Sequence, residues 1–219
     1  KGLTKAGRAS KMAYQVLKIA KEQKLDIEKA LFDNNARVAG DATTARELAG
    51  TETWFTSTIQ NKGSGGAHAA GTGADARTDG TQTAFDQDKF DAIMQNCWEK
   101  GGKPDSVYLS AYLMNLALAF DGNNNQRSNV QASDKKVIKS LDVYITPWGT
   151  VEFIPSRENR GRTVHVMQDD MWAVAVLRGT KNVELAKTGD NSTRQVVTEL
   201  TLVAKNEKSS GLGVDFSTS

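Results

Sequence analysis

The sequence is poor in the residues that most often carry chemistry. It has one cysteine, Cys97, and two histidines, His68 and His165, among 219 residues. A single cysteine excludes an intrachain disulfide and fits a reducing compartment. Metal sites and nucleophilic triads need such residues brought together, so neither is favoured. There is no run of 18 apolar residues and no signal-peptide pattern, so nothing in the sequence directs it into or across a membrane.

The overall charge is also small, because 28 basic residues face 26 acidic ones for a net charge of +2. With 25% charged and 38% hydrophobic residues, the composition is that of a globular protein and excludes global disorder. Its length suffices for one large domain or two small ones. Residues 1–30 hold eight basic and three acidic residues, a local charge of +5 that leaves −3 for the rest. Such asymmetry fits a solvated helix face better than contact with nucleic acid or an acidic partner.

A long helix is predicted at the start of the chain, from Lys5 to Phe32. This segment contains no proline and only one glycine. Apolar residues recur at three- and four-residue intervals on one face, namely Ala6, Ala9, Ala13, Val16, Ala20, Ile27 and Leu31. At 1.5 Å per residue the helix would be about 42 Å long. Because its apolar stripe is thin and rich in alanine, we expect a rod lying across the back of a sheet rather than a helix sunk in a core.

Little regular structure is predicted between this helix and residue 83. The polar and glycine residues of 34–41 indicate a turn, and a short amphipathic piece is expected from Thr43 to Ile59. The tract 61–83 is rich in glycine, with serine, threonine, aspartate and alanine between the glycines. Such a segment buries too little apolar surface to offset its ordering entropy, so we expect a long exposed loop or linker.

Two helices that flank a short strand are predicted next. Thr83-Ala84-Phe85-Asp86 has the form of a capping box, and Gly101-Gly102 supplies a stop. The apolar face of this first helix carries Phe90, Ile93, Met94, Cys97 and Trp98. Residues 107–109 indicate a buried strand, after which Ser110 can cap a second helix. That second helix carries Leu113, Leu116, Ala117 and Phe120.

Strand patterns dominate the rest of the chain. Leu141, Val143 and Ile145 alternate with polar residues, and a turn at 146–149 leads to Val151 and Phe153, which together predict a hairpin. Residues 163–167 and 171–177 are expected to form another pair of strands, and further strands are expected at residues 183–187 and 194–205. A mixed α+β chain follows, with helices covering one or both faces of a sheet.

No group of residues makes a convincing catalytic or cofactor site. Residues 71–76 match a dinucleotide fingerprint with alanine in the third place, but no strand precedes them, which favours a loop. His165 lies between Val164 and Val166, a pattern that favours a surface or hydrogen-bonded structural role. The neighbouring Asp169 and Asp170 could act as acid and base or bind a divalent cation, yet such pairs more often mark a turn.

Two further groups have mainly structural interpretations. Cys97 is expected as a small core residue, and His68 as a solvated loop residue. Arg157, Arg160 and Arg162 form a basic cluster in a predicted loop. Without interleaved aromatic residues the nucleic-acid signal there is weak, so phosphate binding and a salt-bridged loop at a subunit boundary both stay open. The lack of a catalytic group favours a structural protein that needs no cofactor or metal.

Several separated stretches carry a resemblance to a known family. They are Ala6–Gln15, Lys24–Leu31, Val38–Arg46, the Trp-Glu-Lys-Gly-Gly-Lys-Pro-Asp stretch Trp98–Asp105, and the Lys-Thr-Gly-Asp turn Lys187–Asp190. In this order they resemble a branch of the tailed-phage major capsid proteins, which adopt the Hong Kong 97 capsid fold. The resemblance covers nearly the whole chain.

The resemblance implies an α+β fold with a long spine helix over a peripheral β-sheet and a helix-flanked mixed-sheet axial domain. Residues 1–60 and 177–208 would form the peripheral domain, 84–176 and 209–219 the axial domain, and 61–83 the glycine-rich loop or linker. The implied function is that of a major capsid protein, a non-enzymatic subunit. Such subunits assemble as hexamers and pentamers into the icosahedral shell of a tailed phage around double-stranded DNA.

The resemblance also implies partners and a location. The partners would be copies of the chain itself, together with scaffold, portal and decoration proteins and the nearby packaged DNA, with no membrane. The protein would be assembled in the host cytoplasm and reside in the virion. The candidate subunit-interface residues are Arg8, Lys11, Lys18, Asn123, Asn124, Asn125, Arg157, Arg160 and Arg162.

Family members carry an amino-terminal arm and an extended hairpin loop before the spine helix. This sequence begins, at Lys1-Gly2-Leu3-Thr4, where that loop would return. Because arm and loop clasp neighbouring subunits in the family, assembly by this chain alone is left open. An encapsulin-like compartment shell is the alternative within the same fold. Two other hypotheses are a hydrolase or transferase using Asp169, Asp170 and His165, and nucleic-acid binding through Lys5, Arg8, Lys11, Lys18 and Lys21.

Overall fold

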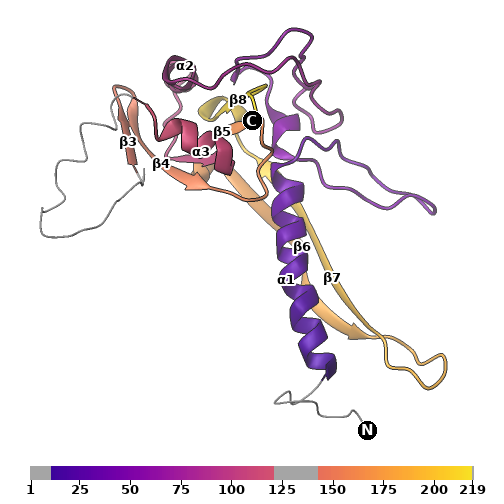
Figure 1. Cartoon of the computed structure of the whole chain (residues 1–219). Helices are drawn as coiled ribbons and strands as arrows, with labels where there is room; N and C mark the ends of the chain where they lie inside the picture. The colour runs from indigo at the N-terminus through magenta and orange to yellow at the C-terminus, as the bar shows by residue number, and fades with distance from the viewer. Residues whose placement is uncertain (1–10, 121–142, 219) are drawn as a thin grey trace, which may run out of the picture.

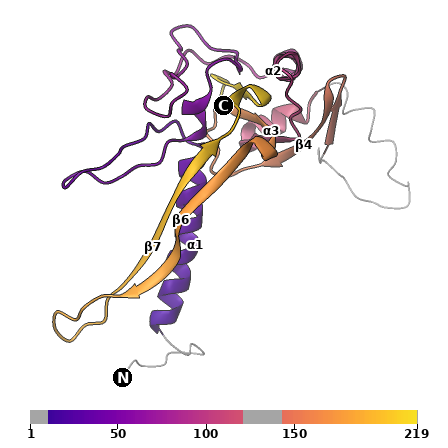
Figure 2. The same ribbon diagram turned by 180° about the vertical axis from the view of Figure 1, so that it is seen from behind.

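The architecture combines a helix-covered mixed sheet with a rod and ribbon that extend away from it. A computed structural model describes residues 11–120 and 143–218 of the chain. In it a six-stranded sheet carries two helices, while a long helix and a two-stranded ribbon run side by side to one end of the molecule (Figure 1 and, from behind, Figure 2). The α+β class predicted from the sequence is therefore confirmed.

The rod is helix α1, Lys11–Phe32. It ends where the sequence predicts, whereas the predicted first residues, 5–10, lie outside the described part. One side of α1 is half-buried along a stripe of Met12, Val16, Ala20, Gln23, Ile27 and Ala30. No residue of α1 is fully buried, and Ala13, expected on the inner face, is exposed. α1 contacts β7. The thin alanine-rich stripe therefore gives a surface rod that lies against strands, as predicted.

Irregular chain follows the rod. Residues 37–48 project from the molecule as an arm, closed by paired main-chain hydrogen bonds of 3.1 Å between Val38 and Glu47. The piece expected to be amphipathic from Thr43 forms no α-helix. It is exposed up to residue 47, then forms the buried 3₁₀ turn η1, Thr51–Trp54, and the short strand β1, Ile59–Gln60.

The glycine-rich tract 61–83 forms no helix or named strand, as predicted, but the expectation that it is exposed was wrong for part of it. Ala69 is fully buried and the side chain of Arg77 is buried with it. Gly63 and Gly80 allow backbones to approach so closely that a Cβ on Gly63 would lie 2.0 Å from the Thr81 carbonyl oxygen. The tract therefore packs onto the body because its glycines permit close contact and Arg77 finds acidic partners.

The sheet has the strand order β1-β8-β5-β2-β4-β3. Besides β1, its strands are β2 (Ser106–Leu109), β3 (Val143–Thr146), β4 (Gly149–Pro155), β5 (Val164–Met167) and β8 (Gly211–Gly213). Pairs β1–β8 and β2–β4 are parallel and the others antiparallel. The hairpin predicted around 146–149 is confirmed as β3–β4, but Tyr144 points to the core whereas Val143 and Ile145 are exposed.

The main core lies between one face of this sheet and helices α2, Gln87–Glu99, and α3, Ala111–Ala117. It contains an aromatic cluster of Phe85, Phe90, Phe120, Tyr144 and Phe153. The predicted inner face of α2 is confirmed except for Trp98, which is 59% exposed.

Helix ends follow local side-chain chemistry. The N-cap of α2 is Asp86 rather than the predicted Thr83, because its carboxylate accepts a 3.0 Å hydrogen bond from Lys89 N. Ser110 caps α3 as predicted, accepting from Leu113 N at 3.5 Å. Gly101, at φ +83, ends α2 in the left-handed conformation that glycine adopts without steric cost.

A smaller cluster covers part of the opposite, back face of the sheet. Phe55, Met167, Leu212 and Val214 are buried there. The end of α1 packs onto the same face, because the ring of Phe32 lies 5.1 Å from Tyr108 and 5.2 Å from His165, measured between centroids.

The ribbon consists of β6, Trp172–Glu184, and β7, Arg194–Ala204, paired antiparallel with register shifts around Arg178. The strands predicted at 163–167 and 171–177 exist but do not pair with each other, since β5 pairs with β2 and β8. The 3₁₀ turn η3, Asp169–Met171, separates them, and a second 3₁₀ turn, η4 (Glu207–Ser209), follows the ribbon. Leu202 is the ribbon's one buried residue, so most of this element lies outside any core.

Candidate functional site

The residues that could form a hydrolytic site do not converge. His165 is fully buried, and neither ring nitrogen has a hydrogen-bond partner in the described part of the chain. Burial, together with the charges of Arg160 and Arg77, lowers the pKa of His165 to about 3. The predicted surface or hydrogen-bonded role was therefore wrong, because the end of α1 covers this face. A buried neutral imidazole without partners cannot exchange protons with a substrate near neutral pH.

Asp169 and Asp170 lie instead at the surface, in turn η3, where the sequence favoured a turn. Asp169 accepts a 2.9 Å hydrogen bond from Ser106 Oγ. Burial and the neighbouring Asp105 and Asp170 raise the pKa of Asp169, although the Ser106 bond opposes this. In the described residues His165 makes no hydrogen bond to either carboxylate, so the acid–base group suggested from the sequence does not form.

Cys97 is buried in the main core, as predicted, and burial raises the pKa of its thiol to about 12. No group of three or more His, Cys, Asp or Glu side chains in the described residues is arranged to hold a metal ion. Gly71 and Gly73, at φ +76 and +71, lie in bends of the packed tract, with no strand-to-helix turn that could bind a pyrophosphate. No helix among these residues has the length and hydropathy to cross a bilayer.

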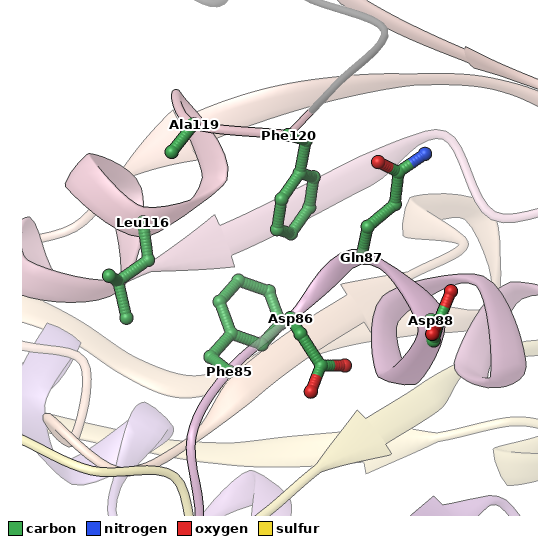
Figure 3. A pocket seen from close by; sticks show the side chains of 7 residues that line it. All are labelled: Phe85, Asp86, Gln87, Asp88, Leu116, Ala119 and Phe120. Atoms are coloured by element: carbon green, nitrogen blue, oxygen red, sulfur yellow. The ribbon is translucent and has the colours of Figure 1, made fainter.

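A small pocket of about 380 Å³ opens between the start of α2 and the end of α3. Figure 3 shows the rings of Phe85 and Phe120, whose centroids are 5.4 Å apart, beside Leu116 and Asp86. Asp86 is the N-cap of α2. Burial raises its pKa, but the hydrogen bonds from Lys89 lower it by more, so the pKa lies below its ordinary value. The pocket is thus an open depression over the aromatic core. Of the two carboxylates that line it, Asp86 already caps α2.

The most highly organised polar group is an ion cluster around Arg77. Its guanidinium bonds three carboxylates: Glu52 at 3.1 Å, Asp215 at 3.2 Å and Asp79 at 2.5 Å. The side chains of Arg77, Glu52 and Asp215 are fully buried. Arg162 also bonds Asp215, at 2.8 Å, and Asp79, at 3.2 Å.

Arg160 connects the same cluster to the rod. It bonds Glu52 at 2.8 Å and Asp79 at 2.6 Å, and lies 3.8 Å from Asp33, the residue after α1. Nearby Glu52 and Asp79 raise the pKa of Arg160 although burial lowers it. The cluster therefore joins η1, the glycine-rich tract, the loop before β5, the carboxyl-terminal segment and the end of α1. Two of its arginines stand out in the sequence as a basic cluster, but their acidic partners do not, because they are scattered over more than 160 positions.

The interface residues predicted from the sequence fall into three groups. Arg8 and Asn123, Asn124 and Asn125 lie outside the described residues. Lys11 and Lys18 are exposed on α1, and Arg157 is exposed in the loop that also carries Arg160. Arg160 and Arg162 are salt-bridged within the chain, with side chains 20% and 19% exposed.

Rod and ribbon carry many of the large apolar side chains that the structure leaves in solvent. On α1 they include Leu17, 65% exposed, and on the ribbon Leu177, 80% exposed. Others on these two elements are Tyr14, Ile19, Leu25, Val174, Val176, Val183 and Val203. A groove of about 940 Å³ runs between α1, the arm 37–48 and the ribbon, with Ile27, Trp54 and Leu200 among its lining. Exposed apolar surface of this extent is typical of protein interfaces.

Comparisons with known proteins identify the architecture. A model of the family described as SU10 major capsid protein matches residues 1–217. A comparison with curated proteins found no match. Among solved structures, the chain is similar to a chain of the cyanophage A-1(L) capsid asymmetric unit, with a TM-score of 0.61 and 14% identity over 93% of this chain and 70% of that chain.

A second similar structure is the holo-SrpI encapsulin complex from Synechococcus elongatus PCC 7942. Its TM-score is 0.54 and its identity 11%, over 98% of this chain and 69% of that chain. At these identities the likeness shows the fold alone, which is the Hong Kong 97-like fold of shell proteins.

The class is thus that of capsid-type shell subunits. Within it, the chain belongs to the SU10 major capsid protein family. It is a non-enzymatic major capsid protein of a tailed phage and a component of the virion capsid, which confirms the resemblance seen in the sequence.

Proposed function

We propose that the chain tiles the phage shell through the plate made by the rod and the ribbon, as hexamers and pentamers of copies of itself. Residues 1–60 and 177–208 would be the peripheral domain, 84–176 and 209–219 the axial domain, and 61–83 the segment between them. The separation of rod and ribbon from the six-stranded sheet supports this division (Figure 1). The proposed boundary at 177 falls inside β6, so that strand would pass from one domain to the other.

The exposed apolar surface of this plate carries the proposal. A two-stranded ribbon is marginally stable in water by itself, and here one buried residue, Leu202, anchors a ribbon of 13 and 11 residues. Neighbouring copies that cover Val176 and Leu177 would remove that surface from water at about 25 cal/mol per Å². Many such contacts, each modest, add up to a closed shell.

The polar residues proposed at the subunit interfaces have different parts in this arrangement. Lys11, Lys18 and Arg157 have solvent-facing side chains that a neighbour could contact. Arg160 and Arg162 would hold their loop rigid behind such a contact, since their guanidinium groups are bound to Glu52, Asp79 and Asp215. Arg8 and Asn123–Asn125 are proposed on the family resemblance.

Scaffold, portal and decoration proteins and the packaged double-stranded DNA are the further partners we propose, with assembly in the host cytoplasm. The basic residues of α1 support non-specific proximity to DNA, because lysines on one rod attract phosphates at low salt. An affinity for DNA that does not fall between low and moderate salt would contradict this part.

Electron microscopy and sedimentation velocity of the full-length protein, expressed alone and with its scaffold, test the proposed function. We expect capsomers or closed shells. Protein that stays monomeric at every concentration and ionic strength, while folded by circular dichroism, would contradict self-assembly through this plate.

A further inference from the structure

In the part of the chain that the structure describes, the back face of the sheet is covered over β5 and β2 but uncovered at its β4–β3 end. Val143, Glu152 and Ser106 lie side by side on this face, because β3, β4 and β2 pair in that register. Ser106 is buried, whereas Glu152 is exposed and Val143 is 46% exposed. Ile145, two residues further along β3, is 65% exposed on the same face. In addition, β3 is the edge strand of the sheet.

Acidic side chains border this uncovered face. Asp105 precedes β2, Asp169 and Asp170 follow β5, and all three are exposed, as is Glu152. Asp105 and Asp169 are adjacent, since Asp169 N donates to Asp105 Oδ1 at 3.1 Å. Among the described residues, two cations lie nearby: Lys103 is exposed, and Lys205 Nζ donates to the main-chain oxygen of Asp170 rather than to a carboxylate. The surface therefore combines β-branched apolar side chains with an excess of negative charge.

The complementary pattern lies on α1. The side of the rod opposite its half-buried stripe carries Lys11, Lys18, Lys21, Leu25 and Lys29, all exposed at helical spacing. Glu22 offsets part of this charge through a 3.7 Å pair with Lys18. Leu25, 49% exposed, supplies apolar surface between the lysines. No element of the described residues covers this stripe. β3 is the edge strand of the sheet, and it lies at the edge away from the rod (Figure 1).

We propose that the uncovered β4–β3 sheet face, bordered by Asp105, Glu152, Asp169 and Asp170, is the docking surface for the basic outer stripe of α1 from a second copy of the chain. This inference rests on the proposed self-assembly and specifies one of its contacts. The two surfaces differ, so the contact is heterologous: each copy offers a stripe to one neighbour and a sheet face to another. Such head-to-tail contacts close into rings when the rotation allows it, as capsomers require.

Charge reversal tests the pairing in the full-length protein. We expect Lys11→Glu with Lys21→Glu, or Glu152→Lys with Asp170→Lys, each to raise the concentration needed for capsomers about tenfold, because like charges then face each other. The carboxylates of Glu152 and Asp170 make no hydrogen bond in the described structure, so these changes spare the fold. All four substitutions together should restore assembly. Lys62→Glu with Lys208→Glu, an equal charge change elsewhere on the surface, is the matched control and should assemble normally.

A disulfide test distinguishes this contact from a symmetric one. Leu25→Cys and Ile145→Cys variants, mixed under mild oxidation, should give a crosslinked dimer that neither variant forms alone, while buried Cys97 stays unreactive. Wild-type capsomers that survive both charge reversals unchanged, a four-fold variant no better than either pair, or no crosslink in the mixture would overturn this docking surface while leaving self-assembly intact. Wild-type protein that forms no capsomers would overturn the proposed function and this contact together.

Discussion

Arg77 is the residue on which the interior charge balance depends. Two fully buried carboxylates, Glu52 and Asp215, share its guanidinium, and Asp215 takes up φ +60 while accepting from it. Burial raises the pKa of Asp215, but the hydrogen bond from Gly63 N and the charge of Arg77 lower it by more. The net pKa is therefore below the ordinary value, and the group stays ionised. Buried ion pairs add little net stability compared with apolar packing, yet removing one partner leaves an uncompensated charge.

Arg77→Met should therefore lower the free energy of unfolding by about 3 kcal/mol, the lower end of the range for breaking a buried pair, because Arg160 and Arg162 still neutralise part of the cluster. Urea denaturation monitored by circular dichroism measures this. Arg157→Met, at an exposed position of similar chemistry, should change stability by no more than about 0.5 kcal/mol. A loss below about 1 kcal/mol for Arg77→Met would contradict the central position of this residue.

His165 should make the subunit sensitive to acid. Its folded pKa of about 3 lies below the ordinary value of 6.5, so between these values the unfolded chain binds a proton that the folded chain excludes. The stability contribution is complete above pH 6.5 and is lost as the pH falls toward 3, at up to about 1.4 kcal/mol per pH unit. Denaturation midpoints at pH 7, 5.5 and 4.5 measure the loss.

His165→Leu should show a flatter dependence than the wild type over this range, because a leucine binds no proton. His68→Gln, which changes an exposed histidine, should keep the wild-type slope. Equal slopes for His165→Leu and the wild type would show that carboxylates alone determine acid sensitivity.

The burial of His165 could not be predicted from its strand pattern. Alternation places Val164 and Val166 on one face and His165 on the other, and this much is confirmed. Whether the second face meets water depends on Phe32 and other residues distant in sequence, which pack there only in the folded chain. Trp98 illustrates the reverse case, since its helical phase suggested the core whereas no element of the described structure covers it.

The positions of elements with a strong local period were mostly predicted correctly, whereas the packing of segments without one was not. The end of α1, the inner face of α2, the cap of α3 and the β3–β4 hairpin follow from spacing and turn residues. The glycine-rich tract has no period, and its packing depends on Arg77 reaching partners far along the chain. Composition alone therefore suggested an exposed loop where the structure has a partly buried one.

Hydrogen exchange should separate the ribbon from the sheet in the monomer. Amides in the outer half of the ribbon, residues 178–184 and 194–199, should exchange at least about 100-fold faster than those of β2 and β5, because little buried apolar surface holds that half together. The matched measurement on assembled shells should show protection in the ribbon and little change in β2. Equal protection of both elements in the monomer would contradict a ribbon stabilised by neighbours.

The whole molecule is built to be completed by other copies. Leu177→Asp should therefore raise the concentration needed for assembly about tenfold or more, while monomer stability changes by no more than about 0.5 kcal/mol, since this side chain is already 80% exposed. Sedimentation velocity and urea denaturation measure the two effects. Thr72→Asp, an exposed position in the glycine-rich tract, is the control and should assemble as the wild type does. A large loss of monomer stability would show that Leu177 belongs to the fold rather than to an interface.

The pairing of strands across the whole molecule could not be predicted from the spacing of apolar residues along the chain. The sequence predicted strands near the right places, but not that β6 pairs with β7 rather than β5, nor that β8 enters the sheet beside β5. The β5–β8 pairing joins residues up to about 50 positions apart, and β1–β8 joins residues about 150 apart. A local pattern says nothing about such partners.

The position of β8 affects when a subunit can exist at all. Residues 211–213 fill the slot between β1 and β5, and Asp215 beside them supplies the last charge to Arg77. A nascent chain that lacks residues 211–215 therefore leaves β1 without its partner strand and Arg77 without the carboxylate of Asp215. We therefore expect a chain that stops before residue 211 to be excluded from a growing shell, because it cannot form the complete sheet that packing in the shell would need.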